Sequence, residues 1–455
     1  MTEGFVDRAD ELDFLRDAVR SDGFELILLY GRRRVGKTEL AKAVLEEHDG
    51  IYHVVVEEEG SKQRESLVAS ISQSVSSYTP AVADWEDVFE WFVSVADGEV
   101  LVIDEFPRLI AEDDSIPSRF QKFVDEYLQT TDITLILTGS SIGMMEDLMA
   151  YENPLYGRRT GQIDLRAFSF RDAVPLLPGE FEDQIQFFSV FGGIPFYLDQ
   201  IDPEKALMEN VRDRICDRNA VLNQEPRMLV KQEFRSPARY LSILESVASG
   251  KTRPKRIADD TDIPLQSISK YLAKLESIRL LEHTKPVTSR NTRSRDGIYT
   301  LGDHFFEFWY RFIYPNMSDV VRDPDAFVES LDLRQFVGRQ FEDICREVID
   351  AEANYPKIGS WWYEEDEIDV VALDEDRDRI LFGEAKWRST EVGSSELERL
   401  RAKSERVRWR SDQREERFAL FSKRGFTDNL REEAADGDVA LYDLDRIERV
   451  FTASR

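Results

Sequence analysis

Short apolar runs recur along the first third of the chain, and most of them end in a glycine, a carboxylate or a hydroxyl residue. Apolar segments of this length are typical of strands buried on both faces of a parallel sheet. Between the runs, apolar residues recur every three or four positions, which predicts amphipathic helices. We expect strands over 26–30, 50–56, 99–105, 134–141 and 161–168, and helices over 39–47, 61–77 and 85–95. The pattern therefore predicts an α/β domain with a parallel sheet.

The residues after the first apolar run match G-x-x-x-x-G-K-[ST], the pattern of a phosphate-binding loop. Its glycines let backbone N–H groups converge on phosphate oxygens. Lys37 is expected to reach the β- and γ-phosphates and Thr38 to bind Mg²⁺. The helix that begins near Lys37 directs the positive end of its dipole at the same anion. The predicted nucleotide-binding residues are Gly31, Arg32, Arg33, Arg34, Val35, Gly36, Lys37, Thr38 and Glu39.

Two carboxylates, Asp104 and Glu105, end the third apolar run. In a P-loop enzyme we expect this strand to lie beside the first one, so that its end faces the phosphates. Asp104 is then predicted to hold Mg²⁺ through water, and Glu105 to polarise the attacking water. Lys37, Asp104 and Glu105 are the predicted catalytic residues. The next run ends in Thr138 and Ser140, which either reach the γ-phosphate or form an ordinary strand-to-helix turn.

A second group of elements follows in residues 236–312. Three helical patterns precede two short strands joined by a polar hairpin, an order that resembles a winged helix-turn-helix, whose third helix enters the major groove of DNA. On that third helix, Gln266, Ser267, Lys270 and Lys274 are expected to face outward. The arginine-rich hairpin tip at 290–295 suits contact with phosphates. The alternative is that this unit packs on the α/β domain and binds protein.

The last third of the chain carries a second candidate chemistry. Glu384 and Lys386 alternate along a predicted strand and therefore share one face of it. With Asp369 on the preceding strand and Glu342 on a helix, they form the D…ExK constellation of the PD-(D/E)xK nucleases. Glu342, Asp369 and Glu384 are predicted to bind Mg²⁺, while Glu384 and Lys386 are predicted to be catalytic. The alternative is an inactive domain in which Glu384 and Lys386 form a strand salt bridge.

Over about its first 235 residues, this order of motifs resembles the AAA+/STAND P-loop ATPases, and more narrowly the prokaryotic archaeal ATPase family. The resemblance implies that residues 5–8, including Arg8, lie near adenine, and that Thr138 is the sensor-1 residue. Gly192-Gly193-Ile194-Pro195 resembles the STAND lid signature, in which Pro195 approaches the nucleotide. Physically, the glycine pair breaks a helix and Pro195 restarts one.

Residues 325–455 resemble the restriction-endonuclease-like domain that closes many archaeal ATPases. The predicted fold is therefore multidomain α/β. Its predicted parts are a P-loop ATPase core over 1–175, a helical lid over 176–235, a winged helix-turn-helix over 236–312 and the nuclease-like domain over 325–455, with a linker over 315–324.

The net charge of −30, from 90 acidic and 60 basic residues, bears on the expected partners. Nucleic-acid-binding domains are usually basic, so one interpretation is a protein that avoids polyanions. We prefer the other, a halophilic surface that stays hydrated in concentrated salt, because the acidic residues are spread along the whole chain. Concentrated salt would also screen the repulsion between such a surface and DNA.

Cysteines and apolar stretches bear on the compartment. The two cysteines, Cys216 and Cys345, lie far apart in sequence, so we expect no disulfide framework and a cytoplasmic location. The sequence has no apolar run of about 18 residues, so neither a transmembrane helix nor a membrane partner is expected. The first residues lack the basic region and apolar stretch of a signal peptide.

Together, these features predict a switch that binds and hydrolyses ATP with Mg²⁺ and couples nucleotide state to DNA contact and to a Mg²⁺-dependent nuclease domain. The alternative is an ATP-dependent scaffold or transcription regulator whose nuclease-like domain is inactive. DNA is the expected partner, with self-association or a protein partner as further expectations.

Overall fold

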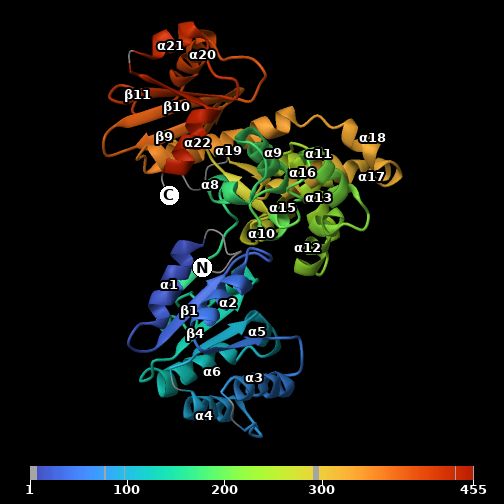
Figure 1. Ribbon diagram of the computed structural model, residues 1–455, viewed down its shortest axis with the longest axis vertical. Helices are drawn as coiled ribbons and strands as arrows, with labels where there is room; N and C mark the ends of the chain where they lie inside the picture. The colour runs from blue at the N-terminus through green and yellow to red at the C-terminus, as the bar shows by residue number, and fades with distance from the viewer. Residues whose placement is uncertain (1–7, 76–77, 97, 290–296, 436, 454–455) are drawn as a thin grey trace. The chain divides into compact units, whose positions relative to one another are not determined.

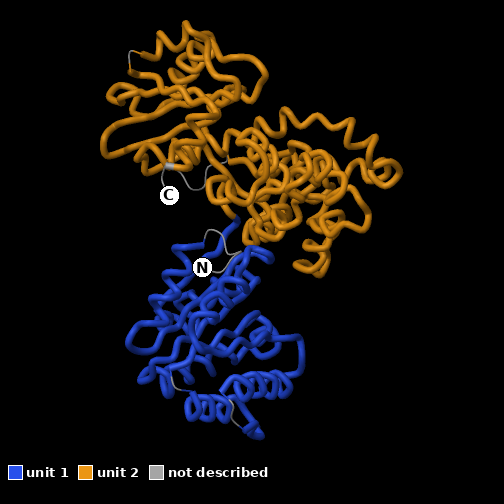
Figure 2. The backbone as a smooth tube through the Cα atoms, viewed as in Figure 1, with its two compact units in different colours: residues 1–167 blue, residues 168–455 orange. Residues whose placement is uncertain are grey.

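The computed structural model describes residues 8–75, 78–96, 98–289, 297–435 and 437–453. The chain divides into two compact units, residues 1–167 and 168–455, shown in different colours in Figure 2. The two units are described separately below.

The first unit is built on a five-stranded parallel sheet in the order β2-β3-β4-β1-β5 (Figure 1). Its strands are β1 (Glu25–Tyr30), β2 (Gly50–Val54), β3 (Val100–Asp104), β4 (Thr134–Gly139) and β5 (Gly161–Asp164). The predicted parallel sheet is confirmed, although β5 is shorter than the apolar run. The predicted neighbour relation of β1 and β3 is wrong, because β4 pairs with both of them and lies between them.

Helices follow the strands of this unit as the periodicity predicts. They are α1 (Ala9–Val19), α2 (Lys37–Glu47), α3 (Gly60–Ser74), α4 (Trp85–Val95), α5 (Pro107–Glu112), α6 (Ile116–Phe123), the π-helix Val124–Leu128 and α7 (Ile142–Asp147). Stacked aromatic rings join α4 to α6, with the ring centroids of Phe89 and Phe123 4.0 Å apart. The same hydrophobic core includes Leu26, Leu101 and Leu135 of the sheet, so this packing covers one face of it.

The second unit begins with helices. They are α8 (Phe170–Ala173), the 3₁₀ helix Val174–Leu176, α9 (Phe181–Phe191), α10 (Pro195–Leu198), α11 (Leu207–Asn210), the π-helix Val211–Cys216, the 3₁₀ helix Val221–Asn223 and α12 (Glu225–Glu233). The predicted break is confirmed: α9 ends before Gly192, which has a φ of 68°, and Pro195 is the first residue of α10.

Three further helices and a two-stranded antiparallel sheet come next, in the predicted order. They are α13 (Ala238–Ala248), α14 (Pro254–Thr261), α15 (Leu265–Ser277), β6 (Leu281–Thr284) and β7 (Ile298–Leu301). The buried residues of α15 include Ile268, Leu272 and Leu275, whereas Lys270 and Lys274 are exposed, as predicted. The hairpin tip at 290–295 lies outside the described residues.

The predicted linker over 315–324 is wrong, because this segment is helical. It contains the 3₁₀ helix Tyr314–Asn316 and α17 (Met317–Arg322), and it leads into α18 (Pro324–Glu329). The two prolines begin helices instead of interrupting them, and the Asp323 carboxylate caps α18 by accepting a 3.1 Å hydrogen bond from the Ala326 N–H. Just before this segment, α16 (His304–Phe308) and the π-helix Trp309–Ile313 are largely buried.

The chain ends in a mixed five-stranded sheet in the order β12-β11-β10-β9-β8 (Figure 1). Its strands are β8 (Lys357–Tyr363), β9 (Asp366–Asp374), β10 (Arg379–Lys386), β11 (Glu415–Ser422) and β12 (Val439–Asp443). The long helix α19 (Arg334–Glu352) packs against β8, β9 and β10, and the remaining helices are α20 (Ser394–Ser404), α21 (Asp428–Ala434) and α22 (Leu444–Ala453). This sheet holds the second candidate site.

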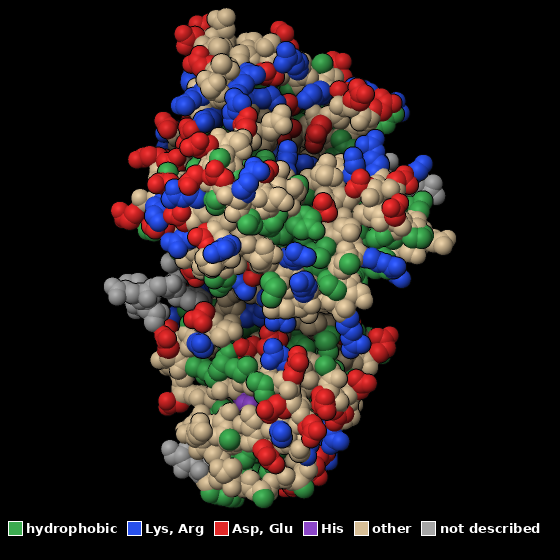
Figure 3. All heavy atoms as spheres, turned by 90° about the vertical axis from the view of Figure 1, so that its right-hand side faces the viewer, with side chains coloured by type: hydrophobic (Ala, Val, Ile, Leu, Met, Phe, Trp, Pro, Cys, Tyr) green, Lys and Arg blue, Asp and Glu red, His purple; other side chains and the backbone are tan. Residues whose placement is uncertain are grey.

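Both cysteines are reduced and buried, Cys216 at the end of the π-helix Val211–Cys216 and Cys345 within α19. Burial raises the pKa of each thiol above its usual value. Among the described helices, none is long and apolar enough to cross a membrane. On the face shown in Figure 3, acidic and basic side chains are interspersed over the surface.

Candidate functional site

The phosphate-binding loop follows β1 and leads into α2, and its backbone requires both glycines. Gly36 has a φ of 96°, in the left-handed region that favours glycine. Gly31 lies so close to the backbone just after β5 that a Cβ there would be 2.1 Å from the Leu165 carbonyl oxygen. The local chain therefore needs the predicted glycine pattern to form this turn.

Lys37 is the first residue of α2, and its side chain turns back over the loop. Its Nζ donates hydrogen bonds of 2.9 Å to the carbonyl oxygens of Gly31 and Arg32. Only 7 % of Lys37 is exposed, so the ammonium group is held at the loop. The Arg8 guanidinium also reaches the loop, where it donates to the Val35 carbonyl at 3.5 Å.

Asp104 ends β3 and accepts hydrogen bonds on both of its carboxylate oxygens. Its Oδ2 accepts from the Thr38 hydroxyl at 3.0 Å and also from the Tyr52 hydroxyl. Its Oδ1 accepts from the Glu105 N–H at 2.9 Å and also from the Thr138 hydroxyl. The structure therefore joins Thr38 and Asp104, as predicted, and places Thr138 against Asp104.

Glu105 follows Asp104 with a φ of 59°, an unusual value for a residue that is not glycine. Its Oε2 accepts a 2.9 Å hydrogen bond from the Ser140 hydroxyl beyond β4. The position of β4 between β1 and β3 explains why Thr138, near its end, and Ser140, just beyond it, meet the two carboxylates. This arrangement offers a general base next to a phosphate-binding loop.

Tyr52 is a site residue that the sequence reasoning missed. It lies on β2, two positions before the strand ends, and it is half-buried. Burial and the neighbouring Asp104 raise the pKa of the Tyr52 phenol. The next residue, His53, is buried: it contacts the Ser70 hydroxyl at 3.0 Å, and burial lowers its pKa to about 4. Strand alternation could have placed Tyr52 and His53 on opposite faces, but it could not have identified the carboxylate partner.

Two further predicted nucleotide-binding residues lie outside the phosphate-binding loop, one in each unit. Glu39 is exposed on α2 and forms an ion pair with Lys42 at 3.5 Å. Pro195 belongs to the second unit, where it begins α10. Of the other loop residues, Arg32 is buried and Arg33 and Arg34 are half-buried.

Glu384 and Lys386 lie on β10 in the second unit and share one face, as alternation predicts. Lys386 Nζ donates to Glu384 Oε1 at 2.6 Å, and Lys403 Nζ on α20 donates to Glu384 Oε2 at 2.9 Å. Asp369 on β9 accepts a 2.9 Å hydrogen bond from the Ala385 N–H. Burial and Glu384 raise the pKa of Asp369. Lys386 also lies on the wall of a cavity of about 790 Å³.

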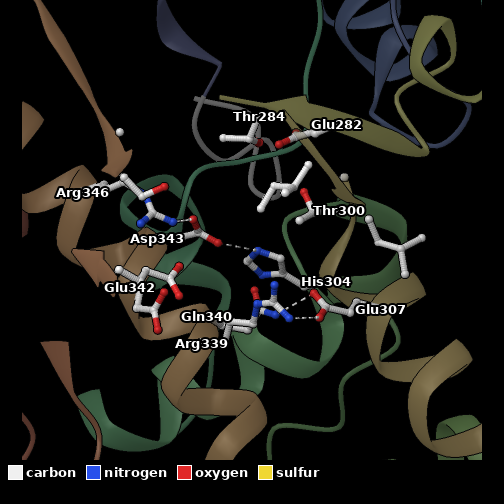
Figure 4. A pocket seen from close by; sticks show the side chains of 16 residues that line it. Glu282, Thr284, Thr300, His304, Glu307, Arg339, Gln340, Glu342, Asp343 and Arg346 are labelled. Carbon is white, nitrogen blue, oxygen red and sulfur yellow. Dashed lines mark hydrogen bonds and ion pairs between the residues drawn. The ribbon is translucent and has the colours of Figure 1, made fainter. Parts of the chain in front are cut away.

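Glu342 lies on α19 and lines the same cavity as Lys386, and it also lines a second cavity of about 350 Å³ (Figure 4). In Figure 4 its neighbour Asp343 lies between Arg346 and His304, with ion pairs marked to both. Burial raises the pKa of Glu342 strongly, and Asp369 adds to this effect. Glu342 and Asp369 are therefore close enough to repel each other as carboxylates.

The two predicted Mg²⁺ sites differ in how well their residues fit a metal ion. Thr38 and Asp104 supply a hydroxyl and a carboxylate beside the phosphate-binding loop, and a Mg²⁺ ion held there would take its remaining ligands from phosphates and water. Over the described ranges, no group of three or more Asp, Glu, His or Cys side chains is arranged to hold a metal ion. At the second site, two lysines contact both oxygens of Glu384, so Glu342, Asp369 and Glu384 as placed do not fit one.

Comparison with known proteins identifies the first region. Residues 5–201 match a family model described as an ATPase domain predominantly from Archaea. Residues 309–400 match a second model, described as archaeal and bacterial proteins of unknown function. An uncharacterized protein of Methanocaldococcus jannaschii is 33 % identical over 397 residues, which span 84 % of this chain and 88 % of that protein. The chain belongs to this family of archaeal ATPase-domain proteins.

This archaeal ATPase-domain protein also matches a second protein in sequence and a solved structure in fold. An uncharacterized ATP-binding protein of the same organism is 55 % identical over 42 residues, which span 9 % of this chain and 71 % of that protein. The Walker-type ATPase of Pyrococcus abyssi has a similar fold, with a TM-score of 0.50 and 20 % identity, and the match covers 68 % of this chain and 97 % of that one. The P-loop ATPase fold of the first unit is thereby confirmed.

Proposed function

We propose that this archaeal ATPase-domain protein is a nucleotide-driven switch that binds ATP with Mg²⁺ at residues 31–38 and hydrolyses it. The observation that carries the proposal is the hydrogen-bonded cluster of Thr38, Asp104 and Thr138 next to Lys37 and Glu105. In P-loop enzymes these residue types bind phosphate, hold Mg²⁺ and activate water. Bound Mg²⁺ would neutralise the charge that develops on the transferred phosphoryl group.

Each residue has a proposed task in this reaction. Lys37 transfers its hydrogen bonds from the two loop carbonyls to phosphate oxygens. Thr38 and Asp104 hold the metal, and the Glu105 carboxylate, oriented by Ser140, accepts the proton of the attacking water. Among the remaining predicted nucleotide contacts, we propose that Arg8 and Glu39 act from the first unit and Pro195 from the second.

We also propose that the second unit contacts DNA through a winged helix formed by α13–α15, β6 and β7. The support is the order of these elements and the exposed polar face of α15, where Gln266, Lys270 and Lys274 project and Ser267 is half-buried. Lysines on the exposed face of such a helix suit contacts with DNA phosphates.

The experiment that tests the whole switch measures the rate of ATP turnover with Mg²⁺ while duplex DNA is added, at high and at low salt. A rate that rises with DNA supports the coupling, and an unchanged rate at both salts contradicts it.

Replacing Lys270 and Lys274 by alanine is expected to weaken duplex binding about tenfold and to reduce the salt slope of binding by about two. Both side chains are exposed on α15, so the change removes charge without disturbing the core. Fluorescence anisotropy of a labelled duplex at several salt concentrations measures both quantities. The matched control replaces Lys62 and Lys122, exposed lysines of the first unit. If both double variants bind the duplex as tightly as the wild type does, contact between α15 and DNA is contradicted.

For residues 325–455, the two lysines on Glu384 favour the alternative of a nuclease-like domain that does not cut. Glu384 is buried, and each lysine is 25 % exposed, so the three charges form a partly desolvated cluster. We propose that this cluster stabilises the sheet and that the domain recruits a partner. Nucleotide-dependent self-association with slow ATP turnover would favour the scaffold or regulator function over the enzyme.

Glu384→Gln is expected to destabilise the second unit by about 2 kcal/mol, because it leaves two facing ammonium groups without a carboxylate. Thermal unfolding measures the loss. The control is Glu415→Gln, which removes an exposed pair with Arg417 on the same sheet and should change little. The wild type would cleave DNA with Mg²⁺ and ATP in high salt if the domain were a nuclease, and Glu384→Gln would not. That pair of results would contradict the structural role and support nuclease activity.

A further inference from the structure

The carboxylate of Asp104 has no lone pair left for a new partner. An ionised carboxylate offers about four acceptor positions. Four donors fill them in this structure: the Glu105 N–H and the Thr138 hydroxyl on Oδ1, and the hydroxyls of Thr38 and Tyr52 on Oδ2. A metal-bound water can therefore hydrogen-bond to Asp104 only after one of these donors leaves.

Three of the four donors are poorly placed to leave. The Glu105 N–H belongs to the backbone next to Asp104, and Thr138 is fully buried within β4. Thr38 can bind Mg²⁺ through its oxygen while its hydroxyl hydrogen still points at Asp104, so metal binding does not require it to move. Tyr52 remains: it is half-buried, and its phenol has no ligand role in the proposed site.

We propose that Tyr52 is a positioning residue that competes with the hydrated metal for Oδ2 of Asp104. The inference rests on the proposed function of the first unit. Without nucleotide, the phenol satisfies Asp104 and keeps it at the end of β3. When Mg²⁺ and nucleotide bind, the phenol gives way to a metal-bound water and swings off Asp104. The Tyr52 hydroxyl therefore sets the Mg²⁺ concentration at which the site binds nucleotide tightly.

Tyr52→Phe tests the competition because it removes the hydroxyl and keeps the ring. Calorimetric titration of a non-hydrolysable ATP analogue at increasing MgCl₂ gives the Mg²⁺ concentration for half-maximal tight binding. We expect this concentration to fall roughly five- to tenfold in Tyr52→Phe, since a hydrogen bond to a charged group no longer opposes the metal. Tyr52→Met, which also lacks the hydroxyl, should shift it in the same direction if the phenylalanine variant folds poorly.

The matched control is Tyr127→Phe, which deletes a tyrosine–carboxylate hydrogen bond to Glu90, 3.0 Å long, elsewhere in the same unit. It should leave the Mg²⁺ requirement unchanged. An unchanged or higher Mg²⁺ requirement in Tyr52→Phe would overturn the inference while leaving the nucleotide site intact. Wild type that binds no nucleotide at any Mg²⁺ concentration would instead overturn the proposed function.

Discussion

Lys37→Ala is expected to weaken ATP binding by at least about 100-fold, because hydrogen bonds to charged groups contribute about 1.5–3 kcal/mol each. The ammonium group is buried at the loop and donates to two of its carbonyl oxygens. Alanine removes the cation that would meet the β- and γ-phosphates and also loosens the loop. Isothermal calorimetry with ATP and Mg²⁺ measures the effect directly.

The control for this variant is Lys62→Ala on α3 in the same unit. Lys62 is an exposed lysine with no proposed role in nucleotide binding, so its loss removes one positive charge from the surface of the unit. Binding in this variant should stay within a few-fold of the wild type. If Lys37→Ala bound ATP as tightly as the wild type does, the phosphate-binding assignment of residues 31–38 would be refuted.

Glu105→Gln is expected to bind ATP normally and to hydrolyse it about 10²–10⁴-fold more slowly, the usual contribution of a general base. The amide keeps the size of the side chain and can still meet the Ser140 hydroxyl, so the geometry is retained while the basic oxygen is lost. Steady-state turnover and single-turnover hydrolysis measure the chemical step, and calorimetry measures binding.

Glu112→Gln provides the comparison, since Glu112 is an exposed carboxylate at the end of α5 in the same unit. Its turnover should match that of the wild type. Hydrolysis in Glu105→Gln at the wild-type rate would require another base, and the cluster around Asp104 would then serve binding alone.

The sequence was most informative where a single local rule governs the structure. The phosphate-binding loop needs glycine at Gly31 and Gly36 for steric reasons, so spacing alone locates it. Buried strands and amphipathic helices were also predictable, because their periodicities differ. Glu384 and Lys386 share a face for the same reason.

The sequence was least informative where pairing between distant segments decides. Nothing in the apolar runs distinguishes a sheet with β1 beside β3 from one with β4 between them, because β1, β3 and β4 are all apolar and buried. The partner of Tyr52 depends on the pairing of β2 with β3, since Asp104 lies 52 residues away in sequence. Lys403 similarly meets Glu384 from a separate helix, and this contact changes the interpretation of the D…ExK pattern. At 315–324, the sequence alone does not distinguish a proline that begins a helix from one that interrupts it.

The burial of Cys216 and Cys345 has a practical consequence for following the switch. Thiol-directed dyes react with the thiolate, and both native thiols are shielded and hard to ionise. A cysteine introduced on the surface of each unit would therefore take up donor and acceptor fluorophores selectively, without removal of the native pair. Energy transfer between the two dyes would then register, in real time, any movement that ATP produces between the units.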